Sequence, residues 1–399
     1  HGPNTGAVFR CWADGSQLEL VAQGLRNPQE LAFDELGYLF TGDNNCDAGD
    51  RARLVYVVEG GDSGWRVSVQ SLADRGPWKS EAMWEMPREE EALQPAWMLP
   101  PVAHINSGPS GLAHYPGVGL PEAFGDYFFL CDYRGGRGSL QAFRVEMAGA
   151  SFVMRGHHTF HDGPAVSDVC FGYDGRIYLS EWGPGWGISP EAKIYTLAHT
   201  ASQETEVVGE VQSWFHRGLD RFSSSRLAEL LSHRDQRVRY EAQRLLVDRE
   251  EVDTFERVLA RSTVRLARLH AVWGVGQLAR KNPVSIQVLI PHLKDPDPEV
   301  LSRLIRVGAE HGLQEAGDTA LEALGAVNHP RLRFHAAYAV GRLRPDGALE
   351  SLIQFVNSNH DLDVYLRHAA VMGLVALQGR SELAPKRKIH ASPCPDAAD

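Results

Sequence analysis

The sequence predicts a two-part molecule, multidomain β then α, in which a partial β-propeller is followed by a HEAT-like α-solenoid. Two observations predict it. Short strand-like runs separated by Asp-Gly and Gly-Gly turns fill residues 1–200, as antiparallel hairpins require. After residue 225, amphipathic helical segments with similar starts recur at intervals of roughly thirty residues, which is typical of helical repeats.

The composition is that of an ordinary globular protein. The chain has 399 residues, of which 43% are hydrophobic and 23% charged. At roughly 100–200 residues per domain, this length suggests two or three domains. The net charge of −11 argues against a broad nucleic-acid-binding face. No run approaches the ~18–20 apolar residues that a membrane-spanning helix needs, so we expect no membrane span in this chain.

The cysteines exclude two classes of site. No two of them form a C-x-x-C pair, which argues against the common zinc knuckles and against a c-type haem attachment site within this chain. Their pairing stays open. The five cysteines are Cys11, Cys46, Cys131, Cys170 and Cys394.

Both ends of the chain resemble cuts. The first residue is His1, with no charged-then-apolar signal peptide before the first strand-like run. The stretch 381–399 is basic and then rich in Pro, Ala and Asp, without an apolar period, and is expected to be an irregular tail. We therefore interpret the chain as an internal fragment of a longer protein.

The strand-like runs define the first part, residues 1–200. Strand–turn–strand units of about 50–70 residues predict propeller blades, and three or four such units fit into this length. Because closed propellers usually need more blades, we expect a partial one. The runs are 7–12, 18–22, 38–41, 53–58, 127–132, 140–145, 166–171 and 176–180.

The helical repeats define the second part, residues 226–380. Each repeat begins with an Asp, Asn or Pro helix start and continues as an amphipathic helix. The polar segment 201–225 is expected to be a linker. A solenoid of this kind is most often a scaffold, so a protein partner is expected to dock on it. Equivalent small or apolar positions, 29–33 residues apart, are Ala242, Ala271, Leu304, Ala336 and Ala369.

An acidic turn in the first part is a candidate metal site. Hard cations such as Ca²⁺ prefer six to eight oxygen ligands, including backbone carbonyls. The spacing does not match an EF-hand, and an Asp/Asn-rich turn without a metal is also common, because these side chains bond to their own backbone. The candidate ligands are Asp43, Asn45, Cys46, Asp47 and Asp50.

Three motifs carry a resemblance to a known family. They are Arg-Asn-Pro-Gln at 26–29, Leu-Ala-Phe at 31–33 and Gly-Gly-Asp-Ser-Gly-Trp at 60–65. Together with the acidic turn they resemble the soluble quinoprotein glucose/sorbosone dehydrogenases, whose propellers are of the six-bladed type. The order of the two parts is similar to that of a family named as membrane-bound dehydrogenases. Full-length members of that family join such a propeller to HEAT repeats and then to a C-terminal c-type cytochrome domain.

The resemblance implies a pocket for pyrroloquinoline quinone (PQQ) with a Ca²⁺ ion. The Ca²⁺ would take the backbone carbonyls of Asn45 and Cys46. An Arg suits the carboxylates of the quinone because its planar fork binds them bidentately. The positions that would contact PQQ are Arg26, Asn27, Asn106 and Arg134.

The chain also departs from the family pattern. Two arginines that the family has before an Asp-Val are replaced here by Ala165 and Ser167, and a Trp that stacks on the quinone falls at His104. The catalytic His would lie in a blade upstream of residue 1, and the haem c motif would lie downstream. We therefore expect the isolated chain to be inactive.

Two functions follow from these residues. The first is a fragment of a dehydrogenase that oxidises a sugar or an alcohol with a quinone and Ca²⁺ and passes electrons to a haem domain of the full-length protein. By resemblance such a protein is periplasmic or secreted. The alternative is a non-catalytic carbohydrate- or protein-binding propeller with a HEAT-repeat docking scaffold, and the two missing arginines favour it.

Overall fold

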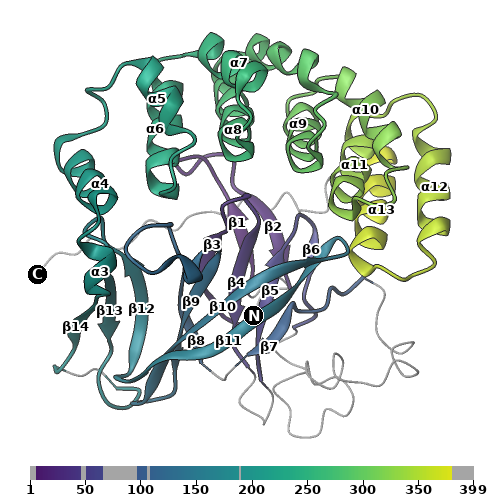
Figure 1. The fold of residues 1–399 in the computed structure, drawn as a ribbon. Coiled ribbons are helices and arrows are strands. Elements are labelled where there is room, and N and C mark those ends of the chain that lie inside the picture. The colour runs from purple at the N-terminus through teal and green to yellow at the C-terminus, as the bar shows by residue number, and fades with distance from the viewer. Residues whose placement is uncertain (1–5, 46–50, 66–96, 106–107, 188–189, 380–399) are drawn as a thin grey trace, which may run out of the picture.

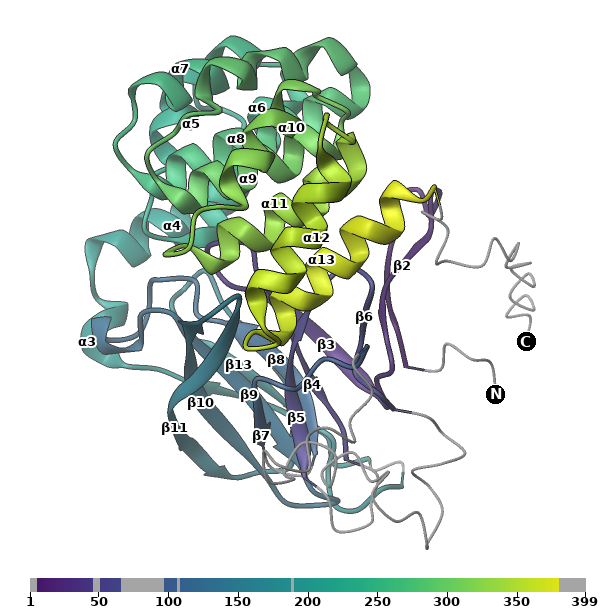
Figure 2. The ribbon, with the colours of Figure 1, turned by 90° about the vertical axis from the view of Figure 1, so that its right-hand side faces the viewer.

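The computed structural model describes residues 6–45, 51–65, 97–105, 108–187 and 190–379. It confirms the predicted fold class, because sheets make up the first half of the chain and helices the second. The helices form an arch over one side of the sheets (Figure 1), and the view turned by 90° shows the same layering (Figure 2). Among the described residues, no helix is both long and apolar enough to cross a membrane.

Four sheets follow one another along the chain, as propeller blades do. The innermost strands of the last three, β3, β8 and β12, pack side by side in that order. Within the described residues the sheets do not close into a ring. The sheets are β1 (Val8–Arg10), β2 (Glu19–Gln23) and β6 (Gly61–Asp62); β3 (Pro28–Phe33), β4 (Leu39–Asp43), β5 (Ala52–Val57) and β7 (Ala103–Ile105); β8 (Pro109–His114), β9 (Tyr127–Tyr133), β10 (Gly138–Ala148) and β11 (Ser151–Gly163); and β12 (Val166–Phe171), β13 (Ile177–Glu181) and β14 (Lys193–Leu197).

All eight predicted strand runs overlap strands of the structure. The predicted runs leave out, among others, the short strand β6 and the outer strands β7, β11 and β14. Strand β11 is long but largely exposed along its second half, so it lacks the apolar alternation that marks a half-buried strand. Residues 109–111 begin the buried innermost strand β8.

The helices pair into repeats. All five predicted repeat positions are fully buried, one on each of α6, α8, α9, α11 and α13. The helices are α3 (Thr200–Gln203), α4 (Glu206–Arg217), α5 (Ser224–Leu230), α6 (Gln236–Asp248), α7 (Val252–Arg261), α8 (Arg265–Lys281), the 3-10 helix η4 (Pro283–His292), α9 (Pro298–Glu310), α10 (Glu315–Ala323), α11 (Pro330–Leu343), α12 (Ala348–Asn359) and α13 (Val364–Leu377).

The predicted helix starts are explained by their caps. The side chains of Asp235, Asp297 and Asp363 accept hydrogen bonds from backbone N–H groups of the first turns of α6, α9 and α13. Such caps satisfy N–H groups that have no partner inside the helix. Acidic turns therefore begin α6, α9 and α13, and Pro330 begins α11, whereas α8 starts after Val264 without a side-chain cap or a proline.

The segment 201–225, expected to be a linker, is largely helical. It contains α4, whose Val208 and Val211 are buried in the main core. Polar residues outnumber apolar ones in this segment. The apolar residues of α4 nevertheless lie on one face of the helix, and that face packs against the main core. Val208 and Val211 thus contribute to the core that the sheets and the solenoid helices share, and the domain boundaries stay a prediction.

The two parts share one hydrophobic core. Tyr38 and Tyr56 of the second blade belong to the same buried cluster as the repeat helices. Tyr56 stacks on Tyr365 of α13 with ring centroids 5.6 Å apart. The solenoid and the sheets are therefore fixed against each other by packing rather than joined by a hinge.

Candidate functional site

In three successive blades, a residue with a carboxylate side chain lies opposite the first residue of the innermost strand. Asp43, Asp132 and Glu181 end the second strand of three successive blades and pair with the first residues of β3, β8 and β12. The register shifts directly after each pair. These blades therefore repeat the same geometry, and the amino ends of their innermost strands lie on the same face of the propeller.

Asp43 holds the predicted cofactor motif in place. Its Oδ1 atom accepts hydrogen bonds from the backbone N–H groups of Arg26 and Asn27, both at 2.9 Å. Its Oδ2 atom pairs with the Arg53 guanidinium, which also donates to the Ser63 carbonyl at 2.8 Å. Both carboxylate oxygens are engaged within the protein, so a metal ion at Asp43 would have to compete with Arg53. Coordination by this residue stays a prediction.

Most of the predicted metal-binding turn lies outside the described residues. Asn45, two residues after Asp43, is buried, whereas Cys46, Asp47 and Asp50 are not described. Among the residues that are described, no group of three or more His, Cys, Asp or Glu side chains could hold a metal ion. The metal site therefore stays a prediction.

The predicted cofactor residue Arg26 lies beside an aromatic ring. Its guanidinium carbon is 5.9 Å from the ring centroid of Trp65. The Trp65 backbone N–H donates to the Gly24 carbonyl at 2.8 Å, which fixes the indole next to the Arg26 loop. The neighbouring Asn27 side chain is exposed. This corner therefore offers one half-buried cation, while the Trp65 ring beside it is buried.

Arg134 lies at the corresponding corner of the next blade. Its Nε atom is 3.1 Å from Oδ2 of the buried Asp132, and half of the Arg134 side chain is exposed. The other oxygen of Asp132 accepts from the Gly108 N–H at 2.9 Å. A loop of the last blade packs here, since Trp186 meets Tyr133 edge-on with ring centroids 5.0 Å apart. Asn106, the remaining predicted cofactor residue, lies outside the described residues.

The departures from the family pattern lie near the same face. Ala165 is buried just before β12, and the Ser167 hydroxyl is 3.1 Å from that of Ser180, so neither position supplies a cation. His104 lies on β7, the outermost strand of the second blade. In the strand register it is opposite Arg53 of β5.

Sequence reasoning missed a carboxyl pair on the inner strands. Glu30 and Asp168 occupy the same blade position as Gly111, which lies on the blade between them. The Glu30 carboxylate accepts the Leu112 N–H at 2.8 Å. Burial, together with the charge and hydrogen bond of Asp168, raises the pKa of Glu30 to about 7. The absence of a side chain at Gly111 makes room for the pair, and superposing the blade repeats in the sequence would have revealed it.

The carboxyl ends of the same strands are covered by α6. The Gln236 N–H donates to the Pro116 carbonyl at 2.8 Å, and its side-chain amide donates to the Asp34 carbonyl at 3.1 Å. Arg237 donates to the Phe171 carbonyl at 2.7 Å. Pro116 and Asp34 follow β8 and β3, and Phe171 is the last residue of β12, so the start of α6 spans the blades at the end opposite the candidate cofactor site.

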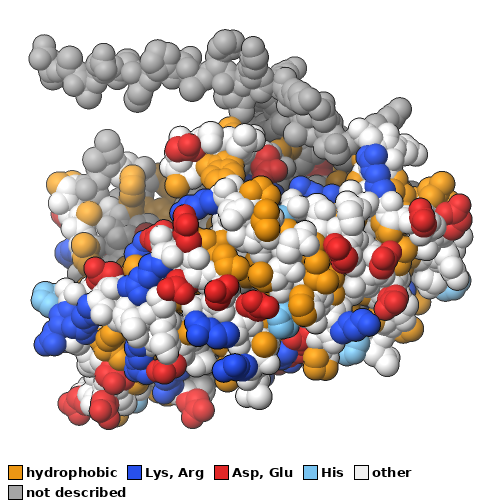
Figure 3. Space-filling model, turned by 90° about the horizontal axis from the view of Figure 1, so that it is seen from above, with side chains coloured by type: hydrophobic (Ala, Val, Ile, Leu, Met, Phe, Trp, Pro, Cys, Tyr) orange, Lys and Arg blue, Asp and Glu red, His pale blue; other side chains and the backbone are white. Residues whose placement is uncertain are grey.

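The inner face of the solenoid is occupied within the chain. Arg303 donates to the Leu36 carbonyl at 2.9 Å and lies 4.2 Å from the ring centroid of Tyr38. The Tyr38 hydroxyl donates to Glu299 at 2.8 Å and accepts from Arg331 at 3.0 Å. A protein partner, expected from the repeats, would therefore have to use their outer face, where acidic and basic side chains are interspersed (Figure 3).

Comparisons with known proteins bear on each part separately. The model of HEAT repeats matches residues 286–375. A search of the curated proteins found no match. Both predicted parts are therefore present. The sheet topology shows the partial propeller, and the helical repeats together with the family match show the HEAT-type repeats.

Several solved structures resemble the chain at low similarity. One is an oxidoreductase (glucose dehydrogenase) from Thermus thermophilus, at 20% identity and a TM-score of 0.32, covering 45% of this chain and 47% of that one. Another is the PQQ-bound aldose sugar dehydrogenase from Streptomyces coelicolor, at 19% identity and a TM-score of 0.33, covering 48% and 52%. A third is a glucose dehydrogenase at 18% identity and a TM-score of 0.34, covering 47% and 49%. The chain thus spans about half the length of these structures.

Proposed function

We propose that this chain forms part of the cofactor pocket of a quinone-dependent dehydrogenase that oxidises a sugar or an alcohol. The observation that carries the proposal is the placement of Arg26, Asn27 and Arg134 at equivalent corners of neighbouring blades. When bound, the quinone would accept hydride from the hydroxyl-bearing carbon of the substrate. In the full-length protein, electrons would pass on to a haem c domain, and the protein would lie in the periplasm or outside the cell.

The residues at this face suit PQQ in part. Its carboxylates would pair with the guanidinium groups of Arg26 and Arg134, and its flat ring system would find an exposed aromatic ring at Trp186. Arg134 already forms an ion pair with the buried Asp132, and this pair weakens the attraction of its guanidinium for another anion. Ca²⁺ would be held by the turn that follows β4, through Asn45 and its successors.

Tryptophan fluorescence tests the proposal. We expect PQQ to quench the fluorescence of the chain in the presence of Ca²⁺ and much less in its absence. Arg26→Ala should weaken quinone binding about tenfold, because a lost charge-assisted contact costs about 1.5–3 kcal/mol. Arg155→Ala, an exposed arginine of β11 that pairs only with Glu146 among the described residues, is the matched control. Quenching that ignores Ca²⁺ and is equal in both variants would contradict the proposal.

Catalysis is a separate test of the same proposal. The predicted catalytic base belongs to a blade that this chain does not contain, so the quinone-loaded chain should not reduce an electron-accepting dye with glucose or ethanol. Dye reduction above a quinone-only blank would show that the chain supplies its own base.

A second candidate function is a non-catalytic binding platform. Ala165 and Ser167 favour it, because a cofactor pocket without their cationic counterparts holds an anionic quinone less firmly. Absence of any quinone-dependent quenching, with or without Ca²⁺, would favour this candidate.

A further inference from the structure

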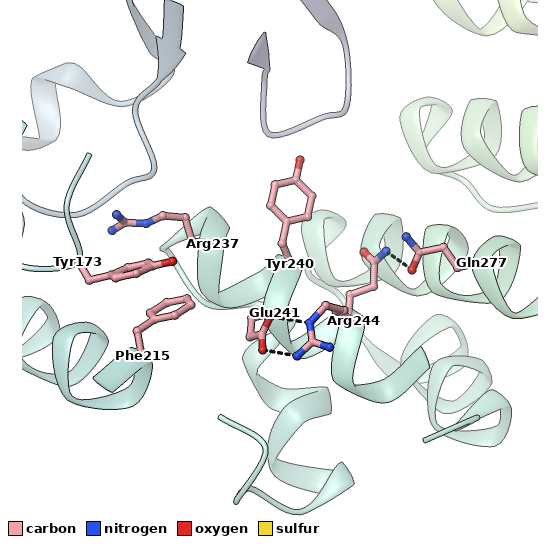
Figure 4. Close-up of a pocket in the computed structure, with 8 residues that line it drawn as sticks. Tyr173, Phe215, Arg237, Tyr240, Glu241, Arg244 and Gln277 are labelled. Carbon is pink, nitrogen blue, oxygen red and sulfur yellow. Dashed lines mark hydrogen bonds and ion pairs between the residues drawn. The ribbon is translucent and has the colours of Figure 1, made fainter. Parts of the chain in front are cut away.

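A cleft of about 420 Å³ lies where the last blade meets the first solenoid helices. Its walls come from the turn between β12 and β13 and from α4, α6 and α8 (Figure 4). A second hollow of about 390 Å³ shares Tyr173 and Phe215 with it. The two hollows are therefore separated by one aromatic ridge.

The ridge is a flat stack of two rings. Tyr173 and Phe215 lie face to face, with centroids 3.8 Å apart and planes 10° from parallel, although Tyr173 is 44% exposed. The Arg237 guanidinium carbon is 4.9 Å from the Tyr173 centroid and helps to hold that ring. Tyr240, 38% exposed, stands between this stack and Gln277 (Figure 4). Because Phe215 and Arg237 cover the two faces of Tyr173, the aromatic surface that the cleft offers is the edge of the Tyr173 ring and the ring of Tyr240.

The charges that line the cleft are paired inside the protein. Arg237 binds Asp235 at 2.6 Å and the Phe171 carbonyl. Arg244 binds both oxygens of Glu241, at 2.6 and 2.8 Å, as Figure 4 shows. Neither guanidinium therefore offers an uncompensated charge, and nothing in this lining selects an ionic ligand.

Polar groups near the aromatic surfaces keep hydrogen-bonding capacity. Gln277 accepts from Gln243 at 3.1 Å through its Oε1 atom. The Tyr240 hydroxyl accepts from Gln236 at 3.0 Å and can still donate its own proton. In the part of the chain that the structure describes, the Gln277 Nε2 group and the Tyr173 hydroxyl have no hydrogen-bond partner.

We propose that this cleft binds a neutral carbohydrate chain. A sugar ring has an apolar C–H face that packs on aromatic rings and hydroxyl groups that pair with amides and phenols. The two hollows on either side of the Tyr173–Phe215 ridge suit neighbouring sugar units. An extended peptide fits less well, because helices and one turn line the cleft and no strand edge is offered for backbone pairing. The site is separate from the proposed cofactor face, since it lies at the solenoid end of the blades.

Calorimetric titration of the full chain, without quinone, tests this inference. The probes are maltohexaose, cellohexaose and xylohexaose. We expect at least one to bind, Tyr240→Ala to weaken that binding at least tenfold, and Gln277→Ala to weaken it about threefold. Tyr240→Phe keeps the ring and should stay within about threefold of the unmodified chain, which guards against a loss caused by misfolding.

The matched control is Phe9→Ala, which removes a comparably exposed aromatic ring on β1 outside the cleft and should leave binding unchanged. Three outcomes would overturn the proposal: binding of none of the three oligosaccharides, unchanged binding in Tyr240→Ala, or equal loss in Phe9→Ala.

Discussion

The two ends of the partial propeller are built from the same strands, but they differ in how far their charged side chains are buried and paired. At the end under the solenoid, polar groups such as Tyr38, Glu299 and Arg331 are buried and satisfy one another. At the other end, the Arg26 side chain is partly exposed, and half of the Arg134 side chain reaches solvent beside Asp132 and Ser139. Buried and fully paired groups fix a structure, whereas exposed cations on a rigid frame can bind a ligand.

This difference changes how the solenoid is interpreted. Helical repeats usually offer their inner face to a partner, but here that face holds the chain's own blades. Tyr338 donates to the Glu59 carbonyl at 2.6 Å, and Tyr365 donates to the Pro100 carbonyl at 2.9 Å. The solenoid therefore acts first as a cap on the open sheets, and its inner face is a structural interface.

The largest expected effect is at the covered end. Arg331→Ala leaves the buried carboxylate of Glu299 without its cation, and breaking such a pair costs about 3–5 kcal/mol. Arg226→Ala breaks an exposed pair with Glu229 and should cost less than about 1 kcal/mol. Urea unfolding measures both. Because the core is shared, we expect one transition; a separate early transition of the helices alone would contradict the idea of a fixed cap.

The next effect concerns the inner strands between the two ends. A Cβ atom at Gly111 would lie 2.5 Å from the Asp168 Cα and 2.9 Å from the Val169 backbone nitrogen, so Gly111→Ala must displace a neighbouring blade. We expect a loss of about 1–3 kcal/mol. Gly209→Ala in α4 meets no atom within 4 Å and should stabilise the chain by up to about 1 kcal/mol. Equal unfolding midpoints for the two variants would show that the blades are not packed as described.

The sequence predicted periodic features well and relationships between blades poorly. Ala242 and its four counterparts were found because burial repeats with the helical repeat. Asp43 was assigned to a metal because an acidic turn suggests hard-cation chemistry, and its buried partner Arg53 lies on another strand. The role of Gly111 in blade packing could not be predicted, because it depends on a side chain of the next blade. The pairing of α6 with three strand ends could not be predicted, since it depends on how two separate patterns pack.

A pH effect distinguishes the inner strands from both ends. The pKa of Glu30 is raised to about 7 by burial and by Asp168, so the folded state binds this proton more tightly than the unfolded state does. Its contribution to stability is therefore greatest below the unfolded pKa and is lost as pH rises toward 7. After allowance for solvent screening, we expect a loss on the order of 1 kcal/mol.

Urea unfolding at pH 5 and pH 8 checks this effect in the unmodified chain and in Glu30→Gln, which cannot titrate. Asp34, whose pKa burial also raises to about 7, titrates in both proteins and cancels in the comparison. The stability difference between the two pH values should shrink in Glu30→Gln. An identical difference in both proteins would contradict the raised pKa of Glu30.

The smallest effect on stability is expected at the open end, where it separates binding from structure. Arg134→Lys keeps a positive charge beside the buried Asp132, so the free energy of unfolding should change by less than about 0.5 kcal/mol. A lysine lacks the planar fork that pairs with a carboxylate, and quinone affinity measured by fluorescence should fall about fivefold. Arg144→Lys, at an exposed pair with Glu146, should change neither quantity. If Arg134→Lys instead lowers stability by more than about 1 kcal/mol and leaves quinone affinity intact, the open end is a structural interface like the covered one, because its cations then serve the fold rather than a ligand.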